Sequence, residues 1–324
     1  MKLTIWSNAE FGATARDLLI EGTRDHRLIW ADTRSANVLE SGARDPQIAE
    51  ADILFGQPAM EDCFEYENVQ WMEVTTSGYT RYDSPFFKET LRDRGGAFTC
   101  AAEVFADPCA QHVLAMMLAL SRNILPSHEA QLTDREWAYE KRRYESVLLT
   151  GQTVLMLGYG AIGRRLTELL APFGMKLIAV RRQTRSERGV KIISEENLSS
   201  ALSEAEHVVN ILPDNASTRG YVNSRRLACC RPGAKFYNVG RGITVDERAL
   251  IEALENGKLS AAYLDVFTEE PLPPEHPLWT TRNCYVTPHT AGGRRDQDEA
   301  LVKHFLANLE RFSYDAEGMT GRIV

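Results

Sequence analysis

The chain has 324 residues and a formal net charge of −8 at neutral pH. That length suffices for two domains with large cores, and the charged and apolar fractions are those of an ordinary soluble globular protein. The basic residues are dispersed, which argues against a nucleic-acid-binding surface and against docking on anionic lipid.

Strand-like runs alternate with helix-like runs almost from end to end, and this pattern favours an α/β fold with parallel sheets. In the first third of the chain, strands are predicted at residues 3–6, 28–30, 53–55 and 71–74 and near Phe98. Asp107 and Pro108 then predict the start of a long apolar helix that ends near Asn123, with Asp as the cap and Pro at the first helical position. The polar and aromatic residues 126–144 are predicted to cross between domains.

The second half continues the alternation. Strands are predicted at residues 154–157, 176–180, 208–212, 235–239, 261–265 and 284–287, and helices at residues 164–173, 247–256 and 296–312. His304 lies in the last of these helices and is interpreted as structural.

The apolar runs, the first residues and the cysteines indicate neither a membrane protein nor a protein of an oxidising compartment. The longest apolar run, residues 113–120, is too short to span a membrane and fits a buried helix. The first residues begin a strand without the core of a signal peptide. The six cysteines are scattered along the sequence, and we expect them to be reduced and mostly buried thiols. We therefore expect a cytoplasmic protein with no membrane partner, no nucleic-acid partner and no metal site.

The most informative motif is a glycine-rich turn between a predicted strand and a predicted helix. Gly158, Gly160 and Gly163 follow the strand at residues 154–157. In such a unit the first glycine allows a tight turn, the second lets a pyrophosphate approach the backbone, and the third lets helix and strand pack closely. The helix start offers N–H groups and a positive dipole end to phosphates. The motif predicts a dinucleotide site, against the alternative of an ordinary turn.

The next strand ends in arginines where an acid is typical. Arg181 and Arg182 follow residues 176–180, with Arg185 shortly after. A guanidinium cannot accept a hydrogen bond from a ribose hydroxyl, but it binds a phosphate through charge-assisted bonds. This pattern favours NADP(H) over NAD(H). The alternative is a solvated basic loop on a protein that still binds NAD(H).

An α/β pattern that begins before the glycine turn and continues after it predicts a nested arrangement. Residues 102–289 would form a Rossmann-like dinucleotide domain. Residues 1–101 and 290–324 would form a discontinuous, flavodoxin-like substrate domain. Such an architecture places a ligand cleft between its domains.

Three side chains near predicted strand ends carry candidate chemistry, since open α/β sheets bind ligands there. Arg241 stands between two glycines and is expected to clamp a substrate carboxylate, although a structural arginine is the alternative. Glu270 precedes a proline, and His289 follows one. Alone, each would be an ordinary loop residue. Together they predict a carboxylate that orients an imidazole for general acid/base work.

In this order, and with the glycine turn upstream, these motifs resemble those of the D-isomer-specific 2-hydroxyacid dehydrogenases, a family that includes glyoxylate/hydroxypyruvate reductases. The resemblance is strong from about Ala102 to Gly293. It implies that Arg241, Glu270 and His289 are catalytic and that the protein forms a homodimer through the long helix after Asp107. It implies a substrate-binding loop with Ser77, Gly78 and Tyr79.

The resemblance also implies a set of cofactor contacts. Together with the motifs above, the resemblance gives the full set of expected cofactor-binding residues. They are Gly158, Gly160, Ala161, Ile162, Gly163, Arg181, Arg182, Leu212, Pro213, Val239, Gly240, Asp265, His289 and Gly292. The chain departs from the family pattern at Gln111, Thr80 and Arg181. The first two departures blur substrate choice, and the third moves the cofactor preference.

The expected reaction is hydride transfer between NADP(H) and a small 2-oxo or D-2-hydroxy acid, with glyoxylate or hydroxypyruvate reduction as the leading hypothesis. One alternative is NAD-dependent oxidation of a bulkier D-2-hydroxy acid. Another is a dinucleotide-sensing protein, like the corepressors that share this fold.

Overall fold

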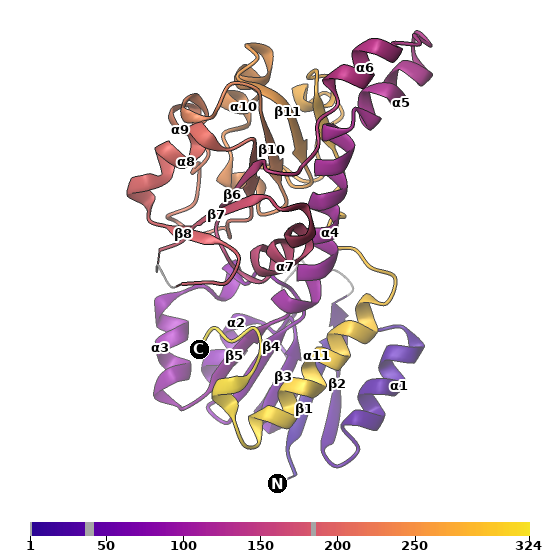
Figure 1. The fold of residues 1–324 in the computed structure, drawn as a ribbon. Coiled ribbons are helices and arrows are strands. Elements are labelled where there is room, and N and C mark those ends of the chain that lie inside the picture. The colour runs from indigo at the N-terminus through magenta and orange to yellow at the C-terminus, as the bar shows by residue number, and fades with distance from the viewer. Residues whose placement is uncertain (1, 36–41, 183–185) are drawn as a thin grey trace. The chain divides into compact units, whose positions relative to one another are not determined.

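The computed structural model describes residues 2–35, 42–182 and 186–324. These residues form two compact units (Figure 1). Unit 1 comprises Met1–Phe105 and Arg294–Val324, and unit 2 comprises Ala106–Gly293. The predicted fold class, two α/β domains with parallel sheets and one domain inserted in a discontinuous other, is confirmed.

Unit 1 contains a five-stranded sheet in the order β2-β1-β3-β4-β5, with every pairing parallel. Its strands are β1 (Thr4–Ala9), β2 (Arg27–Ser35), β3 (Ile53–Gly56), β4 (Trp71–Val74) and β5 (Ala97–Cys100). Its helices are α1 (Ala13–Gly22), α2 (Met60–Glu65), α3 (Pro85–Asp93) and α11 (Gln297–Phe312), with short 3₁₀ turns η1 (Pro46–Glu50), η2 (Thr80–Tyr82) and η7 (Ala316–Gly318).

Helices cover both faces of this sheet, because alternate residues of each buried strand point to opposite sides. On one face Phe55 and Trp71 pack with α1 and α11. The ring of Phe305 lies 4.1 Å from that of Phe55 and 5.1 Å from that of Trp71. On the other face Met72 packs with α2 and α3. Truncating Phe305 to Ala would cost about 3–5 kcal/mol of stability.

Unit 2 contains a seven-stranded parallel sheet in the order β12-β11-β10-β9-β6-β7-β8. Its strands are β6 (Thr153–Leu157), β7 (Lys176–Val180), β8 (Lys191–Ile193), β9 (His207–Asn210), β10 (Ala234–Asn238), β11 (Leu259–Leu264) and β12 (Cys284–Val286). Its helices are α5 (Ile124–Leu132), α6 (Tyr139–Glu145), α7 (Ala161–Leu170), α8 (Leu198–Glu204), α9 (Ser224–Cys229) and α10 (Glu247–Glu255), with 3₁₀ turns η3 (Ala171–Phe173), η4 (Glu195–Asn197), η5 (Gly242–Thr244) and η6 (Pro277–Trp279).

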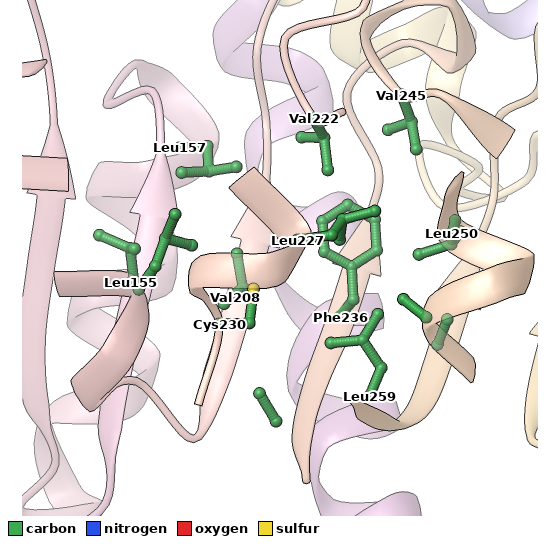
Figure 2. Close-up of a cluster of buried hydrophobic side chains, with 14 of the residues drawn as sticks. Leu155, Leu157, Val208, Val222, Leu227, Cys230, Phe236, Val245, Leu250 and Leu259 are labelled. Carbon is green, nitrogen blue, oxygen red and sulfur yellow. The ribbon is translucent and has the colours of Figure 1, made fainter. Parts of the chain in front are cut away.

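The core of unit 2 also lies on both faces of its sheet. On one face Leu155, Val208 and Phe236 pack with side chains of α8, α9 and α10, such as Leu227 and Leu250 (Figure 2). The alternate residues of the same strands pack on the other face with α7 and with the helix that enters the unit. This packing fixes the carboxyl ends of the central strands, so the loops that follow them begin from a rigid sheet.

The entering helix, α4 (Ala102–Ser121), corrects one sequence prediction. It begins five residues before Asp107, so Pro108 lies inside the helix. A proline there removes one backbone hydrogen bond and crowds a carbonyl of the preceding turn, at about 3 kcal/mol. The helix nevertheless starts early because Val104 is buried against Ala101 and Leu301. Packing of the first turn therefore outweighs the local preference for Pro at a helix start.

By length and composition alone, α4 is also apolar enough to cross a membrane. Its longest uninterrupted apolar run is nevertheless residues 113–120, as predicted, because Gln111 and His112 precede that run. Core helices pass the same criterion. Val113 and Met117 of α4 are fully buried in the core of unit 2.

The predicted interdomain crossing at residues 126–144 is wrong, because this segment lies within unit 2 as helices α5 and α6. Asn123 adopts a left-handed conformation with φ of 54° and separates α4 from α5. The N–H of Val147 then donates to the carbonyl of Ser121 at 2.9 Å, so the excursion closes where it began.

The six cysteines are free thiols, four of them buried, as predicted. Burial raises the pKa of Cys63, Cys109 and Cys284 to about 12, so these thiols stay protonated at neutral pH.

Candidate active site

The glycine-rich turn lies between β6 and α7, as its sequence pattern predicts. Gly158 has φ of 93°, a conformation that favours glycine. A Cβ at Gly163 would lie 2.9 Å from the Tyr159 ring and 3.1 Å from Ile211 Cδ1, so this glycine allows close packing. A Cβ at Gly160 would meet nothing within 4 Å. The first N–H groups of α7, including those of Ala161 and Ile162, have no partner within the helix and suit an anion.

Arg181 lies directly after β7 and is already paired. Its Nη1 lies 3.2 Å from Oε1 of Glu187, and each side chain is 31% exposed. Arg182 is exposed, and Arg185 falls outside the described residues. The end of β7 therefore holds an accessible guanidinium together with a carboxylate that the sequence reasoning did not single out.

The two glycines around Arg241 allow close packing against the backbone of other loops. A Cβ at Gly240 would lie 2.8 Å from the Leu212 carbonyl oxygen, and one at Gly242 would overlap the backbone of Phe267. Arg241 Nη1 donates to the Gly240 carbonyl at 2.7 Å. Burial lowers the pKa of this guanidinium, and nearby negative groups that include Glu270 oppose that effect.

Glu270 and His289 are brought together in unit 2. His289 Nδ1 lies 2.6 Å from Glu270 Oε2, and the other carboxylate oxygen of Glu270 accepts from the Phe267 N–H at 2.8 Å. Burial raises the pKa of Glu270, but the hydrogen bonds from His289 and Phe267 outweigh it and the net pKa is lowered. The ionised carboxylate therefore fixes Nδ1 of His289 as the donor, which leaves Nε2 for chemistry.

His289 stands on strained backbone that a buried acid holds in place. Its φ is 53°, an uncommon value for a residue with a side chain. Asp265, 2% exposed, accepts from the Thr290 N–H at 2.8 Å and from the Ala291 N–H at 2.9 Å. It also accepts from the Thr287 hydroxyl at 2.5 Å. Asp265, predicted as a cofactor contact, thus has both oxygens engaged with the loop that carries His289.

The remaining predicted cofactor residues follow the strand ends of the same sheet. Leu212 and Pro213 come after β9, which ends two residues earlier than predicted, and Val239 and Gly240 come after β10. Gly292 lies in the turn after His289. Asn210, not singled out from the sequence, donates to Asn238 Oδ1 at 2.9 Å and to the Thr244 hydroxyl at 2.7 Å. Asn238 Oδ1 in turn accepts from the Gly240 N–H at 3.1 Å.

The predicted substrate loop lies in unit 1, between β4 and η2. Ser77, Gly78 and Tyr79 are half-buried. The Thr76 hydroxyl donates to the Gly78 carbonyl at 2.6 Å, and the Ala101 N–H donates to the Thr76 carbonyl at 2.9 Å. Gln57 contacts the Thr76 hydroxyl, which the sequence reasoning missed because 19 positions separate the two residues.

Comparison with known proteins identifies the family. Residues 114–291 match the family model described as D-isomer specific 2-hydroxyacid dehydrogenase, NAD binding domain. The chain therefore belongs to the D-isomer specific 2-hydroxyacid dehydrogenases, which are NAD(P)-dependent oxidoreductases acting on a CH–OH group.

Individual relatives cover different shares of the chain. An uncharacterised protein of Corynebacterium melassecola, from the proB 3′ region, is 31% identical over 88% of this chain and 92% of its own length. The glyoxylate/hydroxypyruvate reductase A of Salmonella paratyphi B is 35% identical over 53% of this chain and 54% of its own length. A crystal structure of a D-isomer specific 2-hydroxyacid dehydrogenase from Xanthobacter autotrophicus Py2, in complex with NADPH and MES, has a TM-score of 0.82 and 26% identity, with 100% of this chain and 98% of that chain covered.

Proposed function

We propose that this protein uses NADPH to reduce a small 2-oxo acid, of the glyoxylate or hydroxypyruvate type, to the corresponding 2-hydroxy acid, in the D form where that product is chiral. The observation that carries the proposal is the Glu270–His289 pair, in which a carboxylate 2.6 Å from Nδ1 leaves Nε2 to serve a substrate. Reduction of a carbonyl needs a proton for the developing alkoxide, and such a pair supplies one.

The glycine-rich turn fits a dinucleotide. Gly160 leaves open space where a side chain would stand, and the ten-residue helix α7 presents its N-terminus to that space. When bound, the nicotinamide supplies the hydride. Arg181, and Arg182 beside it, support a 2′-phosphate over a bare ribose. The Xanthobacter structure named above is a complex with NADPH, which agrees with this preference.

Residues of the chain would bind the substrate and supply the proton. Arg241 would hold the substrate carboxylate together with the loop of Ser77, Gly78 and Tyr79, and so fix the face of the reacting carbon. Protonated His289 would give its Nε2 proton to the carbonyl oxygen as the hydride arrives. Glu270 would stabilise the imidazolium before that transfer and keep its orientation afterwards. Proton donation of this kind is worth about 10²–10⁴-fold in rate.

The alternative cofactor, NAD(H), has one observation in its favour. The ion pair to Glu187 already compensates the charge of Arg181, and the Glu187 carboxylate can accept hydrogen bonds from a ribose. A 2′-phosphate would have to share Arg181 with this acid. The preference for NADPH is therefore expected to be moderate.

A panel of 2-oxo acids, with loss of NADPH or NADH absorbance as the readout, tests the proposal. We expect turnover of glyoxylate and hydroxypyruvate, faster with NADPH, and weaker turnover of acids with bulky side chains. Tight binding of either cofactor without turnover of any acid would instead favour a dinucleotide-sensing protein. Faster turnover of bulky acids with NADH would favour the NAD-dependent alternative.

We further propose that the protein is a homodimer. Large apolar side chains are exposed along the α5–α6 excursion and its return, namely Ile124, Leu132, Trp137, Tyr139, Tyr144 and Leu148. Trp137 is 90% exposed, and exposed apolar surface of this kind marks association sites. Light scattering on the purified protein should give twice the mass of one chain, and Trp137→Ser with Leu148→Ser should shift it toward the monomer.

A further inference from the structure

A buried glutamine lies behind the predicted substrate loop. Gln57 directly follows β3 and is 2% exposed. Its N–H donates to Asn8 Oδ1 at 2.8 Å, and its carbonyl accepts from Asn8 Nδ2 at 2.9 Å. Asn8 lies in the adjacent strand β1 and is itself 1% exposed. The two bonds fix the backbone of Gln57 and therefore the direction of its side chain.

The side-chain amide of Gln57 reaches both ends of the loop. Nε2 donates to the Thr75 hydroxyl at 3.1 Å and to the Thr76 hydroxyl at 3.4 Å. Oε1 accepts from Arg81 Nη1 at 3.3 Å. Residues on either side of Ser77, Gly78 and Tyr79 are therefore held by one buried group.

Thr76 holds two peptide units of the loop, one through its hydroxyl, which contacts Gln57, and one through its carbonyl. Because the Thr76 oxygen accepts from Gln57, its single hydrogen is directed to the Gly78 carbonyl, 2.6 Å away. The Thr76 carbonyl is held by the Ala101 N–H. In a trans peptide the carbonyl and the following N–H point in opposite directions. The N–H groups of Ser77 and Tyr79 are thus turned away from these buried partners.

We infer that Gln57 is a positioning residue for substrate: through the Thr76 hydroxyl it holds the Gly78 carbonyl, and so keeps the shape of the loop whose N–H groups bind the substrate carboxylate. This inference rests on the proposed function of that loop. Donors that are oriented before binding lose little freedom when the anion arrives, so they bind it more tightly than a loop that must be ordered. The expected signature is a change in KM for the 2-oxo acid, with kcat and the KM for NADPH preserved.

Two adjacent threonines supply a matched test. Both hydroxyls accept from Gln57, but among the described residues only that of Thr76 bonds to the loop. Thr76→Val keeps the shape and removes the hydroxyl, so the KM for glyoxylate should rise about tenfold, the equivalent of one hydrogen bond. Thr76→Ser retains a hydroxyl and should restore the wild-type KM. Thr75→Val is the control and should leave the KM unchanged.

The route through Gln57 is tested by Gln57→Met, a variant of similar length without a donor. Its KM should rise as in Thr76→Val, and the double variant should show no further rise, because both changes break one connection. Thermal unfolding of each variant checks folding, and the threonine pair carries the test if Gln57→Met is unstable. An equal rise in KM for Thr75→Val and Thr76→Val would show general loosening and overturn the inference, as would multiplicative effects in the double variant.

Ser77→Pro separates failure of this inference from failure of the loop's proposed role, because it removes one loop N–H directly. If Ser77→Pro raises the KM and Thr76→Val does not, Gln57 is no positioning residue and the loop keeps its role. If neither raises the KM, the loop does not bind the carboxylate and the inference falls with it. Absence of turnover in the wild type would instead reject the proposed function as a whole.

Discussion

Two histidines in the described part of the chain contact a glutamate through Nδ1, one in each unit. In unit 2, His289 Nδ1 lies 2.6 Å from Glu270, with side chains 37% and 28% exposed. In unit 1, His304 Nδ1 lies 3.0 Å from Glu73, with side chains 8% and 1% exposed. The two pairs have the same chemical groups and the same connecting nitrogen, so the pairing itself does not distinguish an active site.

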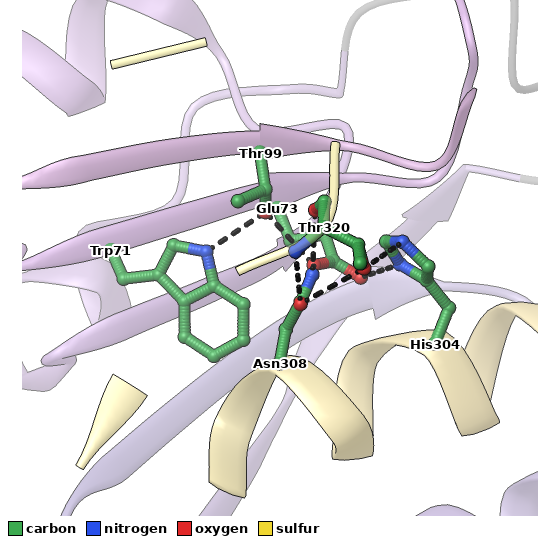
Figure 3. Close-up of polar contacts among 6 residues, drawn as sticks. All are labelled: Trp71, Glu73, Thr99, His304, Asn308 and Thr320. Carbon is green, nitrogen blue, oxygen red and sulfur yellow. Dashed lines mark hydrogen bonds and ion pairs between the residues drawn. The ribbon is translucent and has the colours of Figure 1, made fainter. Parts of the chain in front are cut away.

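The pair in unit 1 belongs to a closed network (Figure 3). His304 Nε2 lies 3.0 Å from the Thr320 hydroxyl. The second oxygen of Glu73 accepts from the Thr99 hydroxyl at 2.8 Å and from Asn308 Nδ2 at 2.7 Å. Each polar atom of the pair is therefore used to join β4 and β5 to α11 and to the chain end near Thr320.

The pair in unit 2 is open at one end. Glu270 is held by Phe267, but within the part of the chain that the structure describes no hydrogen bond reaches His289 Nε2. An imidazole with one nitrogen fixed by a carboxylate and the other accessible can transfer a proton, whereas one with both nitrogens bonded inside a core holds structure together. The two pairs therefore differ in whether Nε2 of the histidine has a hydrogen-bond partner and in how exposed the histidine is.

The largest expected effect comes from exchanging each histidine for glutamine. His289→Gln should lower kcat for the 2-oxo acid by about 10²–10⁴-fold while NADPH still binds, because the amide cannot transfer a proton to the substrate. His304→Gln should leave kcat within about twofold, since its side chain contacts no reacting group, and should lower the unfolding free energy. Steady-state kinetics and cofactor titration measure both. A comparable loss of kcat in the two variants would remove the distinction between the pairs.

Exchanging the glutamate of each pair for glutamine should give a smaller difference in kcat between the two pairs. Glu270→Gln should lower kcat by about 10–100-fold, because a neutral amide no longer stabilises the imidazolium. Glu73→Gln should leave kcat near wild type and lower the unfolding free energy by about 3 kcal/mol, because a buried network loses its charge and one oxygen acceptor. Urea unfolding and kinetics on the same preparations check this. A stable Glu73→Gln protein would mean that the network tolerates a neutral centre.

Much of the fold was predictable from local pattern. The strands β6 and β7 begin or end within a residue of the predicted ranges, since buried parallel strands are continuous apolar runs bounded by turns. The start of α4 was missed because the burial of Val104 is a tertiary effect that outweighs Pro108. The helical excursion after Asn123 was missed because its return is held by hydrogen bonds between residues far apart in the sequence, such as Val147 with Ser121 and Asn123 with Ser146. Three-residue β8 is too short for a periodic signal.

The candidate site also contains residues that the sequence predicted and residues that it did not. The positions of Glu270 and His289 near strand ends follow from their motifs, and the structure brings the two side chains together. The supporting groups were not foreseen, because no spacing rule connects the buried Gln57 or the half-buried Thr287 to the group that it holds. Gly240 and Gly242 each accommodate the backbone of another loop, which residue order does not reveal. The roles assigned to Arg241, Arg181 and the Gly78 loop remain predictions.

A third histidine, without any carboxylate, completes the comparison and gives the smallest expected effect. His207 in β9 is fully buried, with Nδ1 2.9 Å from the Tyr237 hydroxyl and Nε2 2.6 Å from Gln152 Oε1. Burial, assisted by the charge of Lys235, lowers the pKa of His207 from 6.5 to about 3. The neutral ring is satisfied by accepting from Tyr237 and donating to Gln152. Protonation would leave Nδ1 facing a hydroxyl that already has its hydrogen directed at it.

Folding stability should therefore depend on pH through this residue. As pH falls, the unfolded chain takes up the proton near pH 6.5, while folded His207 stays neutral down to about pH 3. The unfolded state binds more protons throughout that window, so the unfolding free energy falls by up to about 1.4 kcal/mol per pH unit, or about 2 kcal/mol between pH 6.5 and pH 5. His207→Gln lacks this titration. Urea titrations of both proteins across the window should show the wild type losing that amount relative to the variant, and parallel curves would mean that folded His207 accepts a proton as readily as an exposed one.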